Sequence, residues 1–451
     1  MAIFHEYLTY TNPLLVTNDD DEAGALERTK SGICELLQLF VGKYEDVFGS
    51  MLSGFANSTW ALLTDLGPEP KYDILVSKAL HFLTAVARSP KHSQSFSSTQ
   101  VLTQVVEKIV LPNMSLRTSD EELFEDDPIE FIRRDLEGSD SDTRRRSATD
   151  FLRQLLEQFD KTVTDVVWQY ITHYLHQYSQ NPGENWRAKD AALYLFASIA
   201  AKGSTERRGV VHTNLHLDVV KFFQSNIAAD LVAPVDDIHP ILKVDAIKYL
   251  FTFRSQLTKA QLSDAFPLLA KHLSSRNYVV YTYTAVTIDR LLAMTADGTP
   301  VFTAQDVSPY TKDILSHLFR LIEQGGTPEK IAENEFLMRC LMRILIVARE
   351  SIGPLVEFAL KELLKITAET SKNPSNPRFN HYTFESLGAV VKSVPPPAPS
   401  LYTDRLTPHR FTGPANPEAL ESALYQPLVV GILVNDVTGL CSLPLRLERS
   451  T

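Results

Sequence analysis

The sequence has few cysteines and no long apolar run. Its 451 residues contain three cysteines, at the widely separated positions Cys34, Cys340 and Cys441. An odd number of distant cysteines does not suit a disulfide framework and fits a reducing compartment. No stretch approaches the roughly 18 uninterrupted apolar residues of a membrane span, so we expect no membrane insertion. The opening MAIFHEYLTYTNPLL has neither the basic start nor the apolar core of a signal peptide. We therefore expect a soluble intracellular protein.

The sequence also lacks the common catalytic and phosphate-binding motifs. Neither G-x-x-x-x-G-K-[ST] nor G-x-G-x-x-G occurs. The stretch His5–Thr9 begins like the zinc motif H-E-x-x-H but has no second histidine. Two histidine pairs, His173 with His176 and His212 with His216, have spacings that could bring two imidazoles together, but neither has an obvious third ligand. We expect no catalysis, no metal and no cofactor. An enzyme that uses His212 or His216 is the remaining enzymatic hypothesis.

Positive charge is in the minority. With 44 Lys and Arg against 55 Asp and Glu, the formal charge is −11 and the isoelectric point is near 5.6. This balance argues against a nucleic-acid-binding surface over the whole protein and leaves room for basic partners. A hydrophobic content of 44% is that of a packed protein.

What the sequence has in abundance is the periodicity of amphipathic helices. Apolar residues from Val163 to Tyr178 recur at i, i+3, i+4 and i+7. Further periodic segments, which we expect to pair as helices, are 26–48 with 51–66, 73–88 with 101–110 (ended by Pro112), 186–201 with 217–231, 241–255 with 259–273, 278–294 with 306–324, 328–349 with 352–370, and a last helix at 378–394.

The pairs begin roughly 40–50 residues apart, which is the period of HEAT and armadillo repeats. Alternating strand-type runs and Asn-Gly hairpins are missing. The expected fold is therefore all-α, an α-solenoid of HEAT repeats in which each pair buries its apolar face on its neighbours. A set of separate helical bundles is the alternative.

The stretch 123–152, LFEDDPIEFIRRDLEGSDSDTRRRSATDFL, is the densest run of charge and interrupts this rhythm. Asp127 before Pro128 suits a helix N-cap followed by proline at the first helical position. Ile129, Ile132 and Leu136 fall on one face of that short helix. The charged residues around and on this helix are Asp126, Asp127, Arg133, Arg134 and Asp135.

A second helix follows, entered from 139–142. Arg144, Arg145 and Arg146 fall in its first turn, where positive charge opposes the helix dipole. Local helix stability does not explain this placement. A solvated charged face and a surface kept for contact with a partner both remain open.

The character of the sequence changes at Pro395. The stretch 395–451 is proline-rich, with one possible helix at 419–434 and an aperiodic tail that we expect to be disordered. The expected organisation is a HEAT-repeat array over 1–394, with a charged insertion at about 117–142, followed by this segment.

Several stretches together resemble one family. EDDPIEFIRRDLEGSDSDTRRR at 125–146 closely resembles the importin-α re-export receptors, the exportin-2 or cellular apoptosis susceptibility family of the importin-β superfamily. The same resemblance is carried by PKYDILVSKALHFLTAVAR (70–88), VDAIKYLFTFRSQLTKAQL (244–262), YVVYTYTAVTIDRLLAM (278–294), PEKIAENEFLMR (328–339) and NPSNPRFNHYTFESLGA (373–389). It runs nearly continuously from about position 4 to 394 and resumes at 415–437.

The resemblance implies a HEAT-repeat karyopherin without a catalytic site. The family binds importin-α together with Ran-GTP and carries importin-α from nucleus to cytoplasm, so the GTP is carried by Ran. Nucleoporins would be further partners, and the protein would shuttle between nucleus and cytoplasm with transient passage at the nuclear envelope. The resemblance places a contact role on Asp126, Asp127, Arg133, Arg134 and Asp135, and we extend it to Arg144–Arg146.

The sequence departs from the family in two respects. Family members are roughly twice as long, and after Val437 the family continues with an acidic-aromatic helix where this chain has GLCSLPLRLERST. We expect a truncated fragment, with 439–451 either a genuine tail or a gene-model error, and weak or undetectable ternary assembly. A HEAT-repeat scaffold for another protein complex is the alternative function.

Overall fold

The structure is a computed structural model that describes residues 1–136, 143–202 and 209–393. The sequence-based expectations for 395–451 and 139–142 lie outside these residues. The described chain divides into two compact units. The first comprises Met1–Asp230 with Ile238–Gln256, and the second comprises Leu231–Asp237 with the described residues from Leu257 on.

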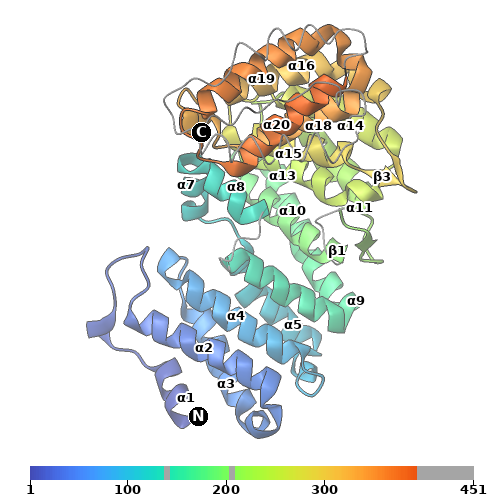
Figure 1. The fold of residues 1–451 in the computed structure, drawn as a ribbon. Helices are drawn as coiled ribbons and strands as arrows, with labels where there is room; N and C mark the ends of the chain where they lie inside the picture. The colour runs from blue at the N-terminus through green and yellow to red at the C-terminus, as the bar shows by residue number, and fades with distance from the viewer. Residues whose placement is uncertain (137–142, 203–208, 394–451) are drawn as a thin grey trace, which may run out of the picture. The chain divides into compact units, whose positions relative to one another are not determined.

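The first unit contains most of the longest helices (Figure 1). Its helices in chain order are α1 (Ala2–Thr9), α2 (Ala25–Lys43), α3 (Glu45–Asp65), α4 (Asp73–Arg88), α5 (Thr99–Val105), α6 (Leu111–Met114), α7 (Thr118–Asp126), α8 (Pro128–Leu136), α9 (Arg144–Gln180), α10 (Trp186–Ala200), α11 (Val219–Phe222), α12 (Ala228–Val232, within which the division falls) and α13 (Pro240–Phe253).

These helices pack in two layers. One layer runs through α2, α4, the first half of α9, α10 and α13, each against the next. Its core is aromatic where α10 meets α11 and α13: the Phe196 ring stacks on Phe222 at 3.6 Å and lies edge-on to Phe253. Phe196 and Phe253 are fully buried. Burial of such a ring stabilises the fold by about 1.5–3 kcal/mol.

Two features of the first unit differ from the sequence-based prediction, and a third agrees with it. The break between the first two long helices falls at Tyr44 (φ −132°, ψ 36°), not near Gly49, which sits inside α3. Pro112 does not end its helix, because a π-helical turn at Val106–Val110 precedes it and the helix continues through α6. The two helices predicted here, one that carries Arg144–Arg146 and one over 163–178, are both present and meet within α9 at a kink, where the backbone of Phe159 is non-helical.

The second unit contains α14 (Lys259–His272), α15 (Tyr278–Leu292), α16 (Ala304–Glu323), α17 (Pro328–Ile331), α18 (Glu335–Ala348), α19 (Val356–Thr370) and α20 (Pro377–Lys392). Helices α15, α18 and α20 lie side by side in one layer, and α14, α16 and α19 pack against them in the other (Figure 1). This regular two-layer stacking of helix pairs is the α-solenoid that the sequence predicts, and the fold class is confirmed.

Short antiparallel ladders connect some of the helices. Strand β1 (Ala201–Lys202) pairs with β2 (His212–Thr213), with Ala201 opposite Thr213. Strand β3 (Thr295–Ala296) pairs with β4 (Thr299–Pro300) across Asp297 and Gly298, both at positive φ. Asp-Gly at two positive-φ positions is a hairpin signal equivalent to Asn-Gly. The sequence contains no Asn-Gly, as noted above, but this Asp-Gly pair forms a hairpin of the same kind.

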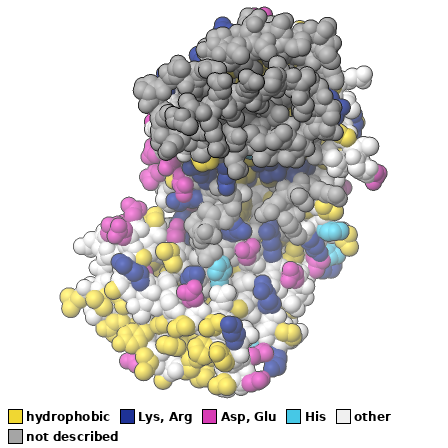
Figure 2. Space-filling model, viewed as in Figure 1, with side chains coloured by type: hydrophobic (Ala, Val, Ile, Leu, Met, Phe, Trp, Pro, Cys, Tyr) yellow, Lys and Arg dark blue, Asp and Glu magenta, His cyan; other side chains and the backbone are white. Residues whose placement is uncertain are grey.

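Apolar side chains gather on one face of the first unit, near α1 and α3 (Figure 2). The exposed apolar residues of the first unit include Ile3, Tyr7, Leu14 and Val47, with 64, 48, 91 and 74% of their surface accessible. None of the helices within 1–136, 143–202 and 209–393 is long and apolar enough to span a membrane.

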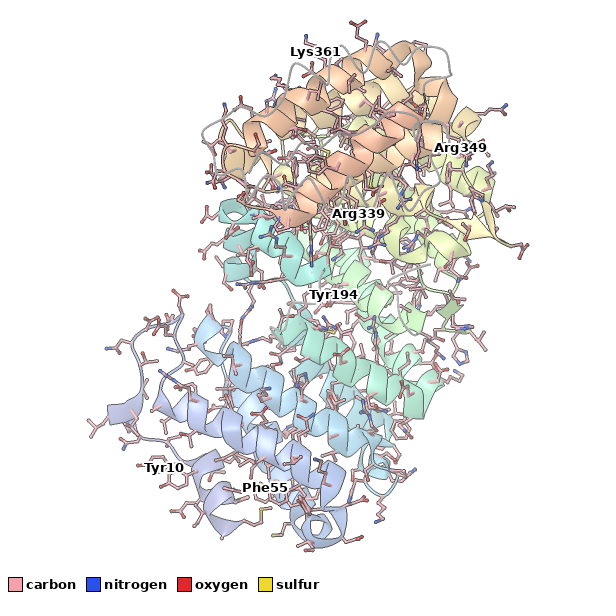
Figure 3. All side chains as sticks on the ribbon, viewed as in Figure 1. Tyr10, Phe55, Tyr194, Arg339, Arg349 and Lys361 are labelled. Atoms are coloured by element: carbon pink, nitrogen blue, oxygen red, sulfur yellow. The ribbon has the colours of Figure 1, made fainter. Side chains whose placement is uncertain are left out.

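Arg349, directly after α18, has strained backbone (φ 47°, ψ −131°). A bulky residue in such a region costs about 1–3 kcal/mol, which glycine avoids. We expect Arg349→Gly to leave the free energy of unfolding unchanged or to raise it by about 1 kcal/mol. Urea unfolding measures it. The matched control is Lys361→Gly, which removes an exposed cation from inside α19 and should cost about 1 kcal/mol. Figure 3 labels both residues in the second unit. An equal loss of unfolding free energy in the two variants would contradict the strain at Arg349.

Candidate partner-binding surface

In the charged stretch, α7 and α8 form a helical hairpin, and Arg144–Arg146 lie in the first turn of α9. At the start of α7, the Asp120 carboxylate accepts a hydrogen bond from the backbone N–H of Arg117 at 3.0 Å. At the start of α8, Pro128 occupies the first position and the Asp127 carboxylate accepts from the N–H of Glu130 at 3.2 Å. The N-cap role predicted for Asp127 is confirmed. Asp and Asn are favoured there because their oxygens satisfy free backbone donors.

A small apolar seam holds the two helices of the hairpin together. The Phe124 ring of α7 meets the Phe131 ring of α8 edge-on, with centroids 5.1 Å apart. Ile129 and Ile132 are buried, as the predicted face requires, and Leu136 is half-buried. This apolar seam is small. The placement of the hairpin therefore depends on the polar contacts at its edges.

The base of the hairpin is closed by Asp73, the first residue of α4. Before the hairpin, Arg117 makes a two-pronged ion pair with the Asp73 carboxylate, at 2.6 and 3.0 Å. After it, Arg144 at the start of α9 donates from Nε to the same carboxylate at 2.9 Å. Bidentate arginine–carboxylate pairs are among the strongest charge-assisted hydrogen bonds.

The electrostatics of the two arginines differ. Burial lowers the pKa of Arg144, against the attraction of Asp73, and the charge of Arg117 lowers it further. Burial also acts to lower the pKa of Arg117, but Asp73 and Asp120 outweigh it, and the pKa rises. Arg144 also donates to the carbonyl oxygens of Gly67 and Glu69 at 2.9 and 3.2 Å. Both guanidiniums are therefore cationic parts of the fold.

Two further ion pairs attach the hairpin to other helices of the same unit. Glu121 of α7 accepts two hydrogen bonds from Arg187 of α10, at 2.7 and 2.6 Å. Asp135 of α8 pairs with Lys248 of α13 at 2.8 Å. The first pair is more than half exposed on the arginine side, so we expect it to contribute about 1 kcal/mol or less.

Arg145 also has partners inside the molecule. Its Nη2 pairs with the buried Asp190 of α10 at 2.7 Å, its Nε donates to the carbonyl of Met114, and its guanidinium lies 3.8 Å from the centre of the Tyr194 ring (Figure 3). Local helix stability does not explain this first-turn cluster, as the sequence indicates, and the structure supplies a tertiary reason for Arg144 and Arg145. Tertiary ion pairs to Asp73 and Asp190 outweigh the unfavourable helix dipole, which is worth about 0.3–1 kcal/mol per charge.

The remaining predicted residues point more to solvent. Asp126 and Arg146 are exposed, and exposed Arg134 makes a local ion pair with Glu130 at 2.8 Å. Asp127 is exposed but serves as a cap, and Arg133 is half-buried and makes contacts of its own. The contact role of these residues stays a prediction. The structure offers Asp126, Arg134 and Arg146 as the side chains that a partner could reach without breaking the fold.

The carboxylates of Asp190 in α10 and Asp245 in α13 lie close enough to interact. Burial raises the pKa of Asp245 in α13 well above its usual range, and the charge of Asp190 raises it further. Lys248 and Arg145 act in the opposite direction, while Asp135 adds to the rise. Among the described residues, Oδ2 of Asp245 is buried without a hydrogen-bond partner. The same part of the chain contains no group of three His, Cys, Asp or Glu side chains that could hold a metal ion.

Comparison with known proteins decides the family. The family profile described as Cse1 matches residues 1–288, and that described as CAS/CSE protein, C-terminus, matches residues 289–445. The chain belongs to the Cse1 family. Among relatives, the importin-alpha re-exporter of Schizosaccharomyces pombe is 47% identical over 438 residues, which cover 97% of this chain. That of Saccharomyces cerevisiae is 48% identical over 418 residues, 91% of this chain, and human Exportin-2 is 39% identical over 441 residues.

Solved structures agree with this assignment. The exportin Cse1 in its cargo-free, cytoplasmic state matches with a TM-score of 0.81 at 47% identity, over 90% of this chain and 43% of that one. Kap121p bound to RanGTP matches with a TM-score of 0.56 at 16% identity, over 89% of this chain and 36% of that one, which shows a shared fold alone. The chain spans 43% of the length of each of the three relatives named above.

The residues that position the hairpin in this Cse1-family chain were missed by sequence reasoning. Asp73, Asp190 and Lys248 lie 44 to 113 positions away from their partners. Each stands in an ordinary amphipathic helix, where a charged residue reads as solvent-facing. The available signal was the first-turn arginine cluster, since its conflict with the helix dipole required distant carboxylates.

We expect Asp245→Asn to stabilise the protein near neutral pH by about 1–2 kcal/mol, the scale of an unsatisfied buried polar group. Because the folded pKa of Asp245 is raised, the native state holds its proton more tightly than the unfolded state, whose pKa is near 3.8. This contribution to stability is complete below pH 3.8 and is lost as pH rises through the folded pKa.

Urea unfolding between about pH 4 and pH 8 measures the effect. The stability difference between Asp245→Asn and the parent should grow as pH rises from the unfolded pKa through the folded one. Asp126→Asn, the same change at an exposed carboxylate, is the matched control and should show no such growth. A destabilised Asp245→Asn at neutral pH would show that the charged carboxylate is needed by Lys248 and Arg145.

Proposed function

We propose that this chain forms part of a nuclear transport receptor that carries importin-α from nucleus to cytoplasm together with Ran-GTP. The observation that carries the proposal is the identity of 47 and 48% to two importin-alpha re-exporters, over 97 and 91% of the chain. We include Ran-GTP in the proposal because the charged stretch resembles the family that binds it. The nucleotide would then belong to Ran, and the chain itself would need no cofactor. Shuttling between the two compartments, and contact with nucleoporins, are parts of the same proposal.

The structure supports a non-catalytic binding role for the α7–α8 hairpin. The hairpin is fixed at its base and on both sides by ion pairs, while Asp126, Arg134 and Arg146 are exposed. A surface that carries both signs of charge on a firmly held element suits recognition of a charged protein partner. The net charge of −11 favours a basic one.

A binding experiment with the chain, importin-α and Ran tests the proposal. Because the chain spans 43% of its relatives, affinities should be weak and are best measured at micromolar protein. We expect more importin-α to be retained with GTP-locked Ran than with GDP-locked Ran, and more Ran-GTP when importin-α is present, since coupling between two ligands is reciprocal. Retention of importin-α that does not depend on the nucleotide would favour a scaffold instead.

Paired variants test the hairpin, together with the first turn of α9, in a separate experiment. Asp126→Ala combined with Arg146→Ala should weaken retention severalfold, because two exposed charges of the proposed surface are lost. Asp264→Ala with Lys361→Ala removes one exposed acid and one exposed base from the second unit and should leave it unchanged. Equal effects of the two pairs would place the contact elsewhere while leaving the nucleotide dependence intact.

A further inference from the structure

The layer formed by α15, α18 and α20 in the second unit contains a cluster of three arginines around one carboxylate. The Asp289 side chain of α15 is 3% exposed. From α18, Arg339 places Nε 3.0 Å from one of its carboxylate oxygens, and Arg343 places Nε 2.9 Å from the other. Figure 3 labels Arg339 on α18, close to α20. One buried carboxylate thus orients two guanidiniums.

Both arginines keep most of their donors available. A guanidinium has five N–H groups in a planar fork, and the Asp289 contacts are made by Nε alone. Neither arginine has another polar side-chain partner among the described residues, and their side chains are 27 and 26% exposed. Within the described part of the chain, the terminal Nη groups of Arg339 and Arg343 can therefore bind a ligand, on side chains whose direction is already fixed.

A third arginine forms no ion pair with a carboxylate in residues 1–136, 143–202 and 209–393. Arg290, next to Asp289 on α15, has a buried Nε without a hydrogen-bond partner in the described chain. Burial lowers the pKa of Arg290, and the nearby charges of Arg339 and Arg343 lower it further, against Asp289. Three positive charges surround one negative charge. A partly buried cation without a partner is costly, and an anion bound from outside would offset that cost.

An aromatic ring borders the cluster. The Arg339 guanidinium lies 5.8 Å from the centre of the Tyr382 ring, which comes from α20. The site is thus built from three neighbouring helices and not from a row of surface side chains. If the cluster were purely structural, it would need only enough positive charge to neutralise Asp289. Arg339 and Arg343 already supply that charge, so the charge of Arg290 is in excess.

We propose that Arg290, Arg339 and Arg343 bind the carboxylates of an acidic segment in a protein partner. The two oxygens of a carboxylate match the planar fork of N–H donors in a guanidinium group. A nucleic acid fits less well, because its phosphates are read by an extended basic stripe, whereas these arginines form a single spot on a chain of net charge −11. The inference goes beyond the proposed export function and does not depend on it, since it concerns α15, α18 and α20 and not the hairpin.

Fluorescence anisotropy with the full chain tests the inference. The probe is a labelled oligoglutamate peptide, compared with an oligoglutamine peptide of equal length and a short single-stranded oligonucleotide. We expect the chain to bind oligoglutamate, not to bind oligoglutamine, and to bind less strongly at about 200 mM than at about 50 mM salt. No binding of oligoglutamate, equal binding of the neutral peptide, or tighter binding of the oligonucleotide would overturn the proposal.

Variants locate the binding. Arg290→Gln should raise the Kd about fivefold to tenfold, because one charge-assisted contact is lost, without lowering the melting temperature. Arg343→Lys keeps the charge but loses the fork, so a smaller rise is expected. The matched control Arg276→Gln, at an exposed arginine of the same unit, should leave the Kd unchanged. An unchanged Kd in Arg290→Gln, or an equal rise in Arg276→Gln, would refute the site.

Discussion

A single carboxylate, that of Asp73, closes the base of the charged hairpin. It binds Arg117 immediately before α7 and Arg144 at the start of α9, so that chain segments on both sides of the hairpin are tied to the start of α4. The two arginines are 15 and 5% exposed, and removing one partner of such a pair leaves a poorly solvated charge. The hairpin's position, and the exposure of Asp126, Arg134 and Arg146, depend on this constraint.

The helical array itself depends on apolar packing, with polar contacts where elements depart from the regular stack. The aromatic cluster around Phe196 joins α10, α11 and α13, while the hairpin is held by Glu121–Arg187 and Asp135–Lys248. Apolar contacts are insensitive to salt, whereas exposed ion pairs are screened within a Debye length of about 8–10 Å. The hairpin should therefore respond to ionic strength before the rest of its unit does.

Much of the fold could be predicted because helical periodicity is a local property of the chain. The segment predicted at 73–88 is α4, and Asp127 caps α8 as expected. Local signals failed where contacts with residues distant in the sequence determine where a helix begins or ends. The helices predicted at 26–48 and 51–66 left a break at 49–50 that in fact occurs at Tyr44, and Pro112 suggested an end that the preceding π-helical turn removes.

The candidate site was predicted less well than the fold. Composition identified the charged stretch but could not tell which charges face inward, because Arg145 meets Asp190 across 45 positions. The arginines around Asp289 gave no signal for the same reason: Arg290 and Arg343 lie on different helices, and each resembles a solvated charge on an amphipathic surface.

Hydrogen exchange of the Asp73→Asn variant tests the central claim most directly. If Asp73 closes the base of the hairpin, backbone amides of α7 and α8 should exchange faster by about tenfold or more, the equivalent of about 1.4 kcal/mol. Amides of α10 in the same unit should change much less, and Asp46→Asn, at an exposed carboxylate, should change neither. Unchanged exchange in α7 and α8, or equal acceleration in α10, would contradict the account.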